Sequence, residues 1–490
     1  MTQFDPSSTE KAISIVGKVD AAPRNSSPED ADEALIPLYQ AQKKIYPRSV
    51  SGLFSRWRWV MVFITQFVFY VTPWFEWGQR QAVLFDLGAR RFYIFGLVIY
   101  PQDFIYLTGI LVVSAMSLFL FTAVAGRQWC GYACPQTVYT EIFLWIERKI
   151  EGDRSARMRL DEAPMSPAKF LRKTAKQVAW IGVGLWTGFT FVGYFTPIRD
   201  LAHLFVTLGM GPWETFWVFF YGFATYGNAG YMREQVCKYM CPYARFQSAM
   251  FDKDTLIVSY DVERGEPRGP RSKKADPKAL GLGDCVDCTL CVQVCPTGID
   301  IRKGLQYECI SCAACIDVCD TVMDKVGYPR GLIRYTTENA MNAHWTRSQV
   351  IRHMVRPRVL IYITIVSVVV IAMLTGLALR TPFKVDVVRD RSTLARIVPG
   401  GKIENVFRLQ LMNASEATQR YRISATGLPG LSIATEDVFT VGPAQARWVV
   451  MGLQLPYEGA QSGSHPIHFE IESLDSPGKI TEKSVFIVPR

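Results

Sequence analysis

Five stretches of the chain are almost continuously apolar. They cover residues 59–75, 104–125, 179–198, 213–232 and 359–379, and Trp57, Trp74 and Trp77 flank the first of them. Each approaches the ~20 residues that an α-helix needs to cross the hydrocarbon core of a bilayer, and tryptophan is enriched where such helices meet water. The pattern therefore predicts an α-helical membrane protein with five transmembrane helices.

The period of the pattern changes in the last part of the chain. From residue 382 to residue 490 apolar and polar residues alternate, most clearly at 407–411 and 467–471, as in half-buried β-strands. Further strand candidates lie at 447–456 and 483–489, and Gly-Pro clusters separate the strands. About seven short strands of this kind predict a C-terminal all-β sandwich of the immunoglobulin type.

Composition agrees with a membrane protein, and the distribution of charge suggests its orientation. The chain has 490 residues, of which 49% are hydrophobic, and a net charge of +10; its mean hydropathy is +0.10. Nine Lys or Arg lie in 126–173 and nineteen in 231–358, but only three in 78–103. Because cytoplasmic loops are enriched in basic residues, we expect the N-terminus and these two basic regions in the cytoplasm and the C-terminus outside. The charge is then a topology signal that also attracts anionic lipids, so nucleic acid is not an expected partner.

The same features divide the chain into five parts. Residues 1–50 are polar and predict a flexible cytoplasmic tail. Residues 51–263 form a membrane core with four spans, and 137–150 have the apolar spacing of a helix lying at the cytoplasmic interface. A basic, Pro- and Gly-rich linker then opens a cysteine-rich module at 264–340. Residues 341–381 connect to the fifth span, and 382–490 form the external sandwich.

All twelve cysteines lie between residues 130 and 319, and eight of them form two similar runs. Each run has three closely spaced cysteines followed by a fourth, which is the bacterial ferredoxin pattern for two [4Fe-4S] clusters. A zinc site usually has cysteine pairs separated by a longer spacer, and disulfides need an oxidising compartment. The spacing therefore predicts an α+β ferredoxin module with two clusters.

In such a module the fourth ligand of each cluster comes from the other run. Pro296 directs the chain away after the fourth cysteine of the first run, whereas Asp320 stands at the matching position of the second. One cluster would be held by Cys285, Cys288, Cys291 and Cys319, and the other by Cys309, Cys312, Cys315 and Cys295.

The remaining four cysteines form two Cys-x3-Cys-Pro motifs, each just after a predicted span. They are Cys130 with Cys134, and Cys237 with Cys241. On a helix, positions i and i+4 share one face, and a proline fits the first turn of the next helix. Four such thiols could bind Cu(I), an iron–sulfur cluster or zinc, or could cycle between dithiol and disulfide. The alternative is that these four cysteines are only small apolar residues that pack the helix ends.

The chain lacks the residues that several other common cofactors require. His203 is the only histidine near a predicted span, so a haem with two histidine ligands is not expected. The chain also has no Gly-x-Gly-x-x-Gly run opening a helix and no Walker A motif, which excludes the usual NAD and ATP sites. Electron transfer is therefore the chemistry that the cysteines predict.

Together these features resemble the CcoG/FixG/Rdx family of accessory proteins for the cbb-type cytochrome c oxidase. The resemblance implies a bacterial inner-membrane protein with a periplasmic C-terminal domain. It also implies a cupric reductase that converts Cu(II) to Cu(I) for the copper-containing oxidase subunit. Electrons from an unidentified donor would pass through the two clusters that the eight ferredoxin cysteines hold. They would then reduce copper at Cys130, Cys134, Cys237 and Cys241. The oxidase subunits or copper chaperones would be its partners.

Two other functions fit the same residues. The membrane core also resembles the polyferredoxins of nitrate and nitrous-oxide respiration, which lack the C-terminal sandwich, and this resemblance implies a quinol dehydrogenase. A scaffold that docks oxidase subunits through its outer domain, without catalysis, is the third hypothesis.

Overall fold

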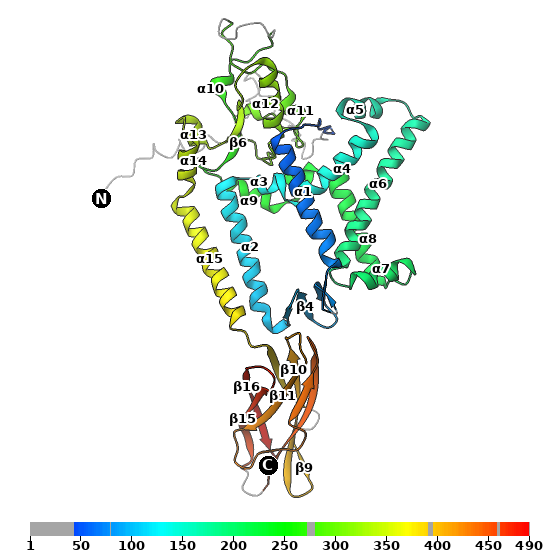
Figure 1. Ribbon diagram of the computed structural model, residues 1–490, viewed down its shortest axis with the longest axis vertical. Helices are drawn as coiled ribbons and strands as arrows, with labels where there is room; N and C mark the ends of the chain where they lie inside the picture. The colour runs from blue at the N-terminus through cyan, green and yellow to red at the C-terminus, as the bar shows by residue number, and fades with distance from the viewer. Residues whose placement is uncertain (1–43, 79, 272–279, 391–394, 458–460, 490) are drawn as a thin grey trace, which may run out of the picture. The chain divides into compact units, whose positions relative to one another are not determined.

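The computed structural model describes residues 44–78, 80–271, 280–390, 395–457 and 461–489. Helices occupy all five predicted apolar stretches (Figure 1). Four of them are the α-helices α1 (Leu53–Val71), α2 (Phe104–Ala125), α6 (Pro167–Val192) and α15 (Pro357–Ala378). The fourth stretch is α8 (Pro212–Tyr226), which continues as the π-helix η5 (Gly227–Met232). Most of the predicted tail, residues 1–43, lies outside the described residues.

By length and composition, two helices in the described part of the chain can cross a membrane: Pro101–Ala125 and Pro357–Ala378. The helices at the other three predicted spans do not meet these criteria of length and composition, and each shows a reason. Helix α1 carries Arg56 and Arg58 near its start, the first half of α6 is basic, and α8 is short because it changes to a π-helix. Two of the predicted spans also extend beyond the helices. Helix α1 ends before Pro73, and α6 ends at Gly193, before α7 (Ile198–Val206) begins. Five spans therefore remain a prediction.

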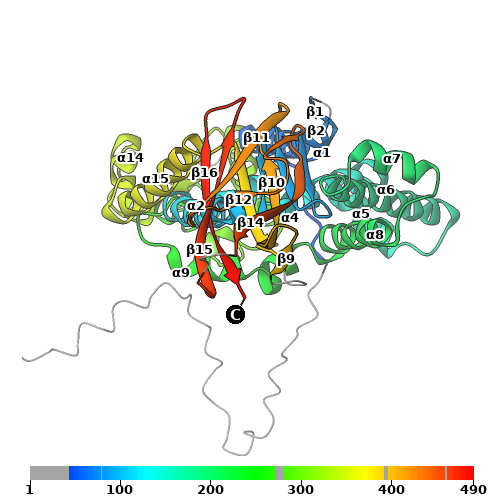
Figure 2. The same ribbon diagram turned by 90° about the horizontal axis from the view of Figure 1, so that it is seen from below.

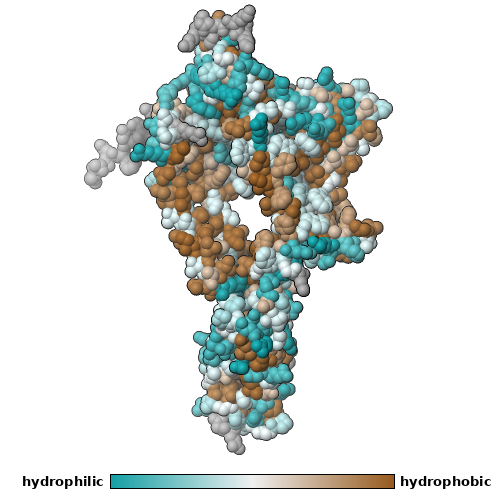
Figure 3. Space-filling model, viewed as in Figure 1, coloured by the Kyte–Doolittle hydropathy of each residue, from teal (hydrophilic) through white to brown (hydrophobic). Residues whose placement is uncertain are grey.

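The long helices turn apolar side chains outward. Phe63 of α1 is 67% exposed, Ile105 of α2 74% and Phe223 of α8 74%, and Figure 3 shows hydrophobic residues covering this region of the surface. Close helix packing is possible at glycines: Gly188 of α6 lies against the backbone of Val218 in α8. Exposed apolar surface of this extent is typical of a membrane protein.

Short helices join the spans on the side of the ferredoxin module. They are α3 (Gln128–Tyr132), α4 (Pro135–Glu151), α5 (Arg154–Glu162), the π-helix η6 (Val236–Met240) and α9 (Pro242–Met250). Helix α4 covers the predicted interfacial helix, but Phe143 is fully buried against Trp180 of α6, with ring centroids 5.1 Å apart. Much of its apolar face therefore packs on protein.

The ferredoxin module contains one antiparallel strand pair and several short helices. Strand β6 (Ile257–Tyr260) pairs with β7 (Ile333–Thr336), so the module's first strand lies before residue 264. Between the strands lie α10 (Val262–Gly265), α11 (Leu290–Gln293), η7 (Ile301–Lys303) and α12 (Ala314–Val326), and α13 (Glu338–Asn342) and α14 (Arg347–Met354) lead to α15. Asp317 of α12 accepts hydrogen bonds from the backbone N–H groups of Phe54 and Ser55, 3.2 and 2.7 Å. The module thus caps the start of α1.

The C-terminal domain is the predicted sandwich, with nine strands among the described residues and not about seven. One sheet has the order β12-β14-β10-β8, with β9 on β10, and the other has the order β13-β11-β15-β16 (Figure 2). The predicted alternation is confirmed: Phe407, Leu409, Ile467 and Phe469 are all fully buried in the core. The strands are β8 (Phe383–Arg389), β9 (Arg396–Val398), β10 (Lys402–Asn413), β11 (Gln419–Thr426), β12 (Ser432–Ile433), β13 (Val438–Val441), β14 (Ala446–Pro456), β15 (Gly463–Ser473) and β16 (Lys479–Val488).

The connection between α1 and α2 forms small sheets that sequence reasoning missed. They comprise β1 (Glu76–Trp77) with β2 (Arg80–Gln81), and β3 (Val83–Asp86), β4 (Arg91–Ile94) and β5 (Leu97–Ile99). Leu84, Tyr93 and Val98 share a buried cluster with Met412 and Ala444 of the C-terminal domain. This connection therefore packs directly on the sandwich.

Candidate functional site

The eight ferredoxin cysteines surround two neighbouring cavities. One cavity is lined by the predicted set Cys285, Cys288, Cys291 and Cys319. A second cavity is lined by the other predicted set, Cys295, Cys309, Cys312 and Cys315, and also by Cys291. Because Cys291 borders both cavities, the two candidate cluster sites adjoin.

The loops that carry these cysteines have matched backbone conformations. Asp287 and Thr289 lie between the first three cysteines of one run, with φ of 53° and 55°. Ser311 and Ala313 hold the same positions in the other run, with φ of 53° and 59°. Left-handed residues at alternate positions turn successive backbone N–H groups toward one side, a nest that binds anions and many iron–sulfur clusters. The residues present therefore fit a [4Fe-4S] cluster in each cavity.

Burial keeps these thiols protonated when no cluster is bound. It raises the pKa of Cys291 to about 11 and the pKa values of Cys309 and Cys319 to about 12. Three cations oppose this effect locally. Arg302 lowers the pKa of Cys291, Arg58 lowers that of Cys312 and Arg127 lowers that of Cys309, although burial still leaves all three raised. Each cluster site thus has at least one guanidinium beside a ligand thiol.

The two Cys-x3-Cys-Pro motifs are built alike, but not as continuous helices. Cys130 lies in α3, whereas Cys134 is the extended residue immediately before α4. Cys237 lies in η6, and Cys241 is the extended residue before α9. The predicted i, i+4 helical face is therefore wrong, because each helix ends between the two thiols. The role of the prolines is confirmed, since Pro135 and Pro242 begin the following helices.

The four thiols of the two motifs lie within electrostatic reach of one another. Burial, followed by Cys134, raises the pKa of Cys130 to about 12, and Cys237 contributes to the same shift. The pKa of Cys237 rises to about 11, first through burial and then through Cys134 and Cys241. We call Cys130, Cys134, Cys237 and Cys241 the thiol site. Its members come from both motifs.

In the described part of the chain, no three His, Cys, Asp or Glu side chains come close enough together to hold one metal ion. One of the four thiols is otherwise engaged, because Cys130 Sγ donates to Gln247 Oε1 at 3.5 Å. Gln247 itself is fully buried.

The thiol site touches the second cluster cavity directly. Gly131, between Cys130 and Cys134, lies so close to the ferredoxin module that a Cβ there would stand 2.6 Å from Ile310 O and 2.9 Å from the backbone of Cys312. A third cavity is lined by Cys237 together with Cys312, Pro296 and Thr297. Buried Arg127 also donates to the carbonyl oxygens of Tyr307 and Ala244. These contacts join the motifs to the cluster held by the second cysteine set.

Sequence reasoning missed Gly131, Arg58, Arg302 and Gln247. The position of Arg58 beside Cys312 depends on packing between segments that lie far apart in the sequence. Gly131 carried a signal, because a glycine between two motif cysteines indicates a close backbone approach, but only the fold shows what it approaches.

Comparisons with known proteins agree with these parts. Family models match as a "4Fe-4S binding domain" at residues 107–152, a "4Fe-4S dicluster domain" at 232–338 and an "IG-like fold at C-terminal of FixG" at 373–489. The nitrogen fixation protein FixG of Rhizobium meliloti is 39% identical over 475 residues, covering 91% of this chain and 89% of FixG. The chain belongs to the FixG/Rdx family. RdxA of Cereibacter sphaeroides is also 39% identical, covering 88% of this chain and 92% of RdxA.

Two further likenesses are partial. The ferredoxin-type protein NapH of Haemophilus influenzae is 25% identical over 196 residues, which are 38% of this chain and 65% of NapH. The crystal structure of a FixG-related protein from Vibrio parahaemolyticus covers 22% of this chain and 97% of its own, with 25% identity and a TM-score of 0.21. As a FixG/Rdx member with 4Fe-4S domains, the chain is an iron–sulfur electron-transfer protein of membranes.

Proposed function

We propose that this FixG/Rdx protein reduces Cu(II) to Cu(I) at its thiol site for the copper centre of a cbb-type cytochrome c oxidase. The observation that carries the proposal is the contact between the thiol site and the second cluster cavity, through Gly131 and through the cavity that Cys237 and Cys312 share. Soft thiolates favour Cu(I) over harder ions. An adjoining one-electron centre then supplies what the reduction needs.

In this proposal each group of cysteines has a separate task. The two crossed sets hold the [4Fe-4S] clusters, which supply one-electron transfer when bound. The set at Cys295, Cys309, Cys312 and Cys315 lies next to the thiol site, and the other set lies behind it. Each Cu(II) takes one electron and leaves as Cu(I), and one reduced cluster is oxidised in exchange. Copper is the substrate here; oxidase subunits or copper chaperones would receive it.

The proposed topology has five spans, with the ferredoxin module in the cytoplasm and the sandwich in the periplasm. Two sets of contacts support it. At one end of the helices, the start of α1 and the α3 segment contact the ferredoxin module. At the other end, the α1–α2 connection contacts both Gly193, after α6, and the sandwich. Active alkaline phosphatase fused after residue 490, and inactive phosphatase fused in the 163–166 turn, would agree with this topology. The reverse pattern would refute it.

The experiment that tests copper reduction uses anaerobically purified protein with reduced clusters. Cu(II) is added, Cu(I) is followed with a chelating dye, and cluster reoxidation is followed by absorbance. We expect about one Cu(I) per cluster electron, and loss of the reaction when the four residues of the thiol site are changed to Ser. If that variant keeps intact clusters and reduces copper equally fast, the thiols are not the copper site.

A specific observation favours a second occupant of the thiol site, an iron–sulfur cluster. The "4Fe-4S binding domain" model covers residues 107–152, where Cys130 and Cys134 are the only cysteines. Iron analysis separates the two possibilities, because two clusters need about eight iron atoms per chain and three need about twelve. Loss of about four iron atoms in the thiol-site Ser variant would favour the third cluster.

The likeness to NapH keeps the quinol dehydrogenase hypothesis as an alternative electron source. It covers 196 residues, about two-fifths of the chain. A quinol added anaerobically would then reduce the clusters without copper. If copper oxidises reduced clusters while quinol leaves oxidised clusters unchanged, the quinol hypothesis fails.

A further inference from the structure

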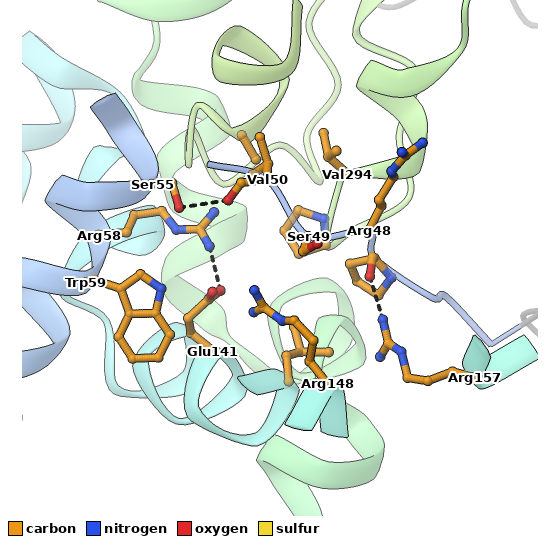
Figure 4. Close-up of a pocket in the computed structure, with 14 residues that line it drawn as sticks. Arg48, Ser49, Val50, Ser55, Arg58, Trp59, Glu141, Arg148, Arg157 and Val294 are labelled. Atoms are coloured by element: carbon orange, nitrogen blue, oxygen red, sulfur yellow. Dashed lines mark hydrogen bonds and ion pairs between the residues drawn. The ribbon is translucent and has the colours of Figure 1, made fainter. Parts of the chain in front are cut away.

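A cavity beside the second cluster site has a strongly basic lining (Figure 4). It reaches Pro296 and Ala314, neighbours of two ligand cysteines. One carboxylate, Glu141, faces it. Four arginines line it: Arg48, Arg58, Arg148 and Arg157.

Two of these arginines are paired within the protein and two are not. Arg58 binds Glu141 at 2.5 Å, and Arg157 binds Glu147 at 2.7 Å. For Arg48 and Arg148, no side-chain hydrogen bond or ion pair exists with any described residue. Figure 4 shows the half-buried Arg148 extending from α4 toward the middle of the cavity. Arg48 is exposed and Arg148 is half-buried, so both guanidinium groups can take an anion that enters from solution, and the lining has more cations than carboxylates.

An apolar stripe runs from this cavity along α1. Trp59 lines the cavity, its ring lies 5.9 Å from that of Phe63, and Phe67 follows one turn later. Phe63 and Phe67 are 67% and 60% exposed, and residues four apart share a helix face. A ligand with an anionic head and an apolar tail therefore matches both features. Basic pockets at the cytoplasmic ends of membrane helices bind lipid head groups in this way.

We propose that the cavity binds the phosphate head group of an anionic lipid, with Arg148 and Arg48 on the phosphate and an acyl chain along Trp59, Phe63 and Phe67. The planar guanidinium fork suits a phosphate with two parallel hydrogen bonds. The proposal does not depend on copper chemistry. It depends on the proposed topology only in that α1 enters the bilayer, which the phosphatase fusions test separately.

The test compares lipid binding by the full-length, cluster-loaded protein after delipidation in detergent. Native mass spectrometry counts bound phosphatidylglycerol, with zwitterionic phosphatidylcholine and inorganic phosphate as separate probes. The test variant is Arg148→Gln. The matched control is Lys149→Gln, which removes the same charge one residue away, where the side chain lies over Trp145 outside the cavity. Cluster absorbance shows that both variants are folded.

We expect phosphatidylglycerol to bind at least tenfold more tightly than phosphatidylcholine, and Arg148→Gln to remove that preference while Lys149→Gln changes it less than twofold. Equal binding of the two lipids, or equal binding by both variants, would overturn the proposal. If inorganic phosphate alone binds as tightly as the lipid and depends on Arg148, the lipid assignment is wrong and the source is free phosphate.

Discussion

At the scale of single residues, each cluster site has its own buried cation. Arg58 lies beside Cys312 and is 10% exposed, and Arg302 lies beside Cys291 and is 8% exposed. Net charge and hydrogen bonding around a cluster set its reduction potential. Because reduction adds negative charge, a neighbouring cation favours the reduced state. The two arginines therefore offer separate control of two adjoining centres.

We predict that Arg58→Gln lowers the potential of the cluster at Cys295, Cys309, Cys312 and Cys315, and leaves the other unchanged. A tenfold change in the one-electron equilibrium corresponds to about 59 mV, and we expect a shift of about that size. Arg302→Gln should do the reverse, so each variant is the control for the other. Potentiometric titration followed by EPR measures both potentials. Equal shifts of both clusters in either variant would contradict the prediction.

Gly131 determines how closely the thiol site can approach the ferredoxin module. The methyl group of Gly131→Ala would lie 2.6 Å from Ile310 O, and backbone atoms there cannot move aside cheaply. We predict that α3 shifts away, that stability falls by roughly 1–3 kcal/mol, and that Cu(II) oxidises the clusters at least tenfold more slowly. The measurement is stopped-flow absorbance of the cluster.

The matched control for that change is Gly182→Ala in α6, where nothing lies within 4 Å of the new methyl group. It should keep the wild-type rate. If Gly131→Ala also keeps that rate with intact clusters, electrons do not pass at this contact.

At the scale of elements, local sequence rules succeeded where one segment determines its own structure. The alternation at 407–411 and 467–471 gave the strands, and Pro135 and Pro242 gave the starts of two helices. Each crossed cysteine set lines one cavity, with Cys291 lining both, and the assignment of cluster ligands stays a prediction. The predicted i, i+4 geometry was wrong because a helix ends between the two thiols of each Cys-x3-Cys-Pro motif. The meander at 83–99 was missed because its strands are short and pack on a domain far along the chain.

A buried ion network joins the elements around the thiol site. Glu147 of α4 is 2% exposed and binds Arg157 of α5 at 2.7 Å and Arg233, after η5, at 2.8 Å. Burial raises the pKa of Glu147, but Arg233 and the other cations more than offset this, so its pKa lies below the ordinary value of 4.5. The charged carboxylate thus joins α4, α5 and the segment that precedes the second motif.

We predict that Glu147→Gln destabilises the protein by roughly 3–5 kcal/mol, because buried cations lose their partner. Since the folded-state pKa is lowered, the stabilisation is present above about pH 4.5 and is lost as pH falls below it. The variant should therefore lose less stability than the wild type as the pH falls from about 5 to about 3. Thermal unfolding in detergent measures both effects. Glu162→Gln, an exposed position on α5, is the control, and equal stability of the two variants would refute the prediction.

At the scale of the whole molecule, one buried carboxylate fixes the sandwich to the start of α2. Asp103 is 2% exposed and binds Arg380 at 2.7 Å as well as Lys384. The Tyr100 hydroxyl also donates to Asn413 O at 2.9 Å. This attachment lies at the opposite end of the helices from the cysteines, so the sandwich and the cysteine sites are far apart in the chain's fold. The separation allows the scaffold hypothesis to be tested without disturbing the clusters.

We predict that Asp103→Asn loosens the sandwich by roughly 3–5 kcal/mol, because Arg380 and Lys384 lose a buried anionic partner. Proteolysis near residue 381 should then become faster, while the clusters and Cu(II) reduction in detergent remain as in the wild type. Asp386→Asn is the control, because Asp386 bonds Gln102 across the same interface at its exposed rim. If Asp103→Asn abolishes oxidase assembly while Cu(II) reduction persists, the sandwich itself is needed as a docking domain. If assembly survives in Asp103→Asn but fails in the thiol-site Ser variant, electron transfer is the essential function and the scaffold hypothesis is wrong.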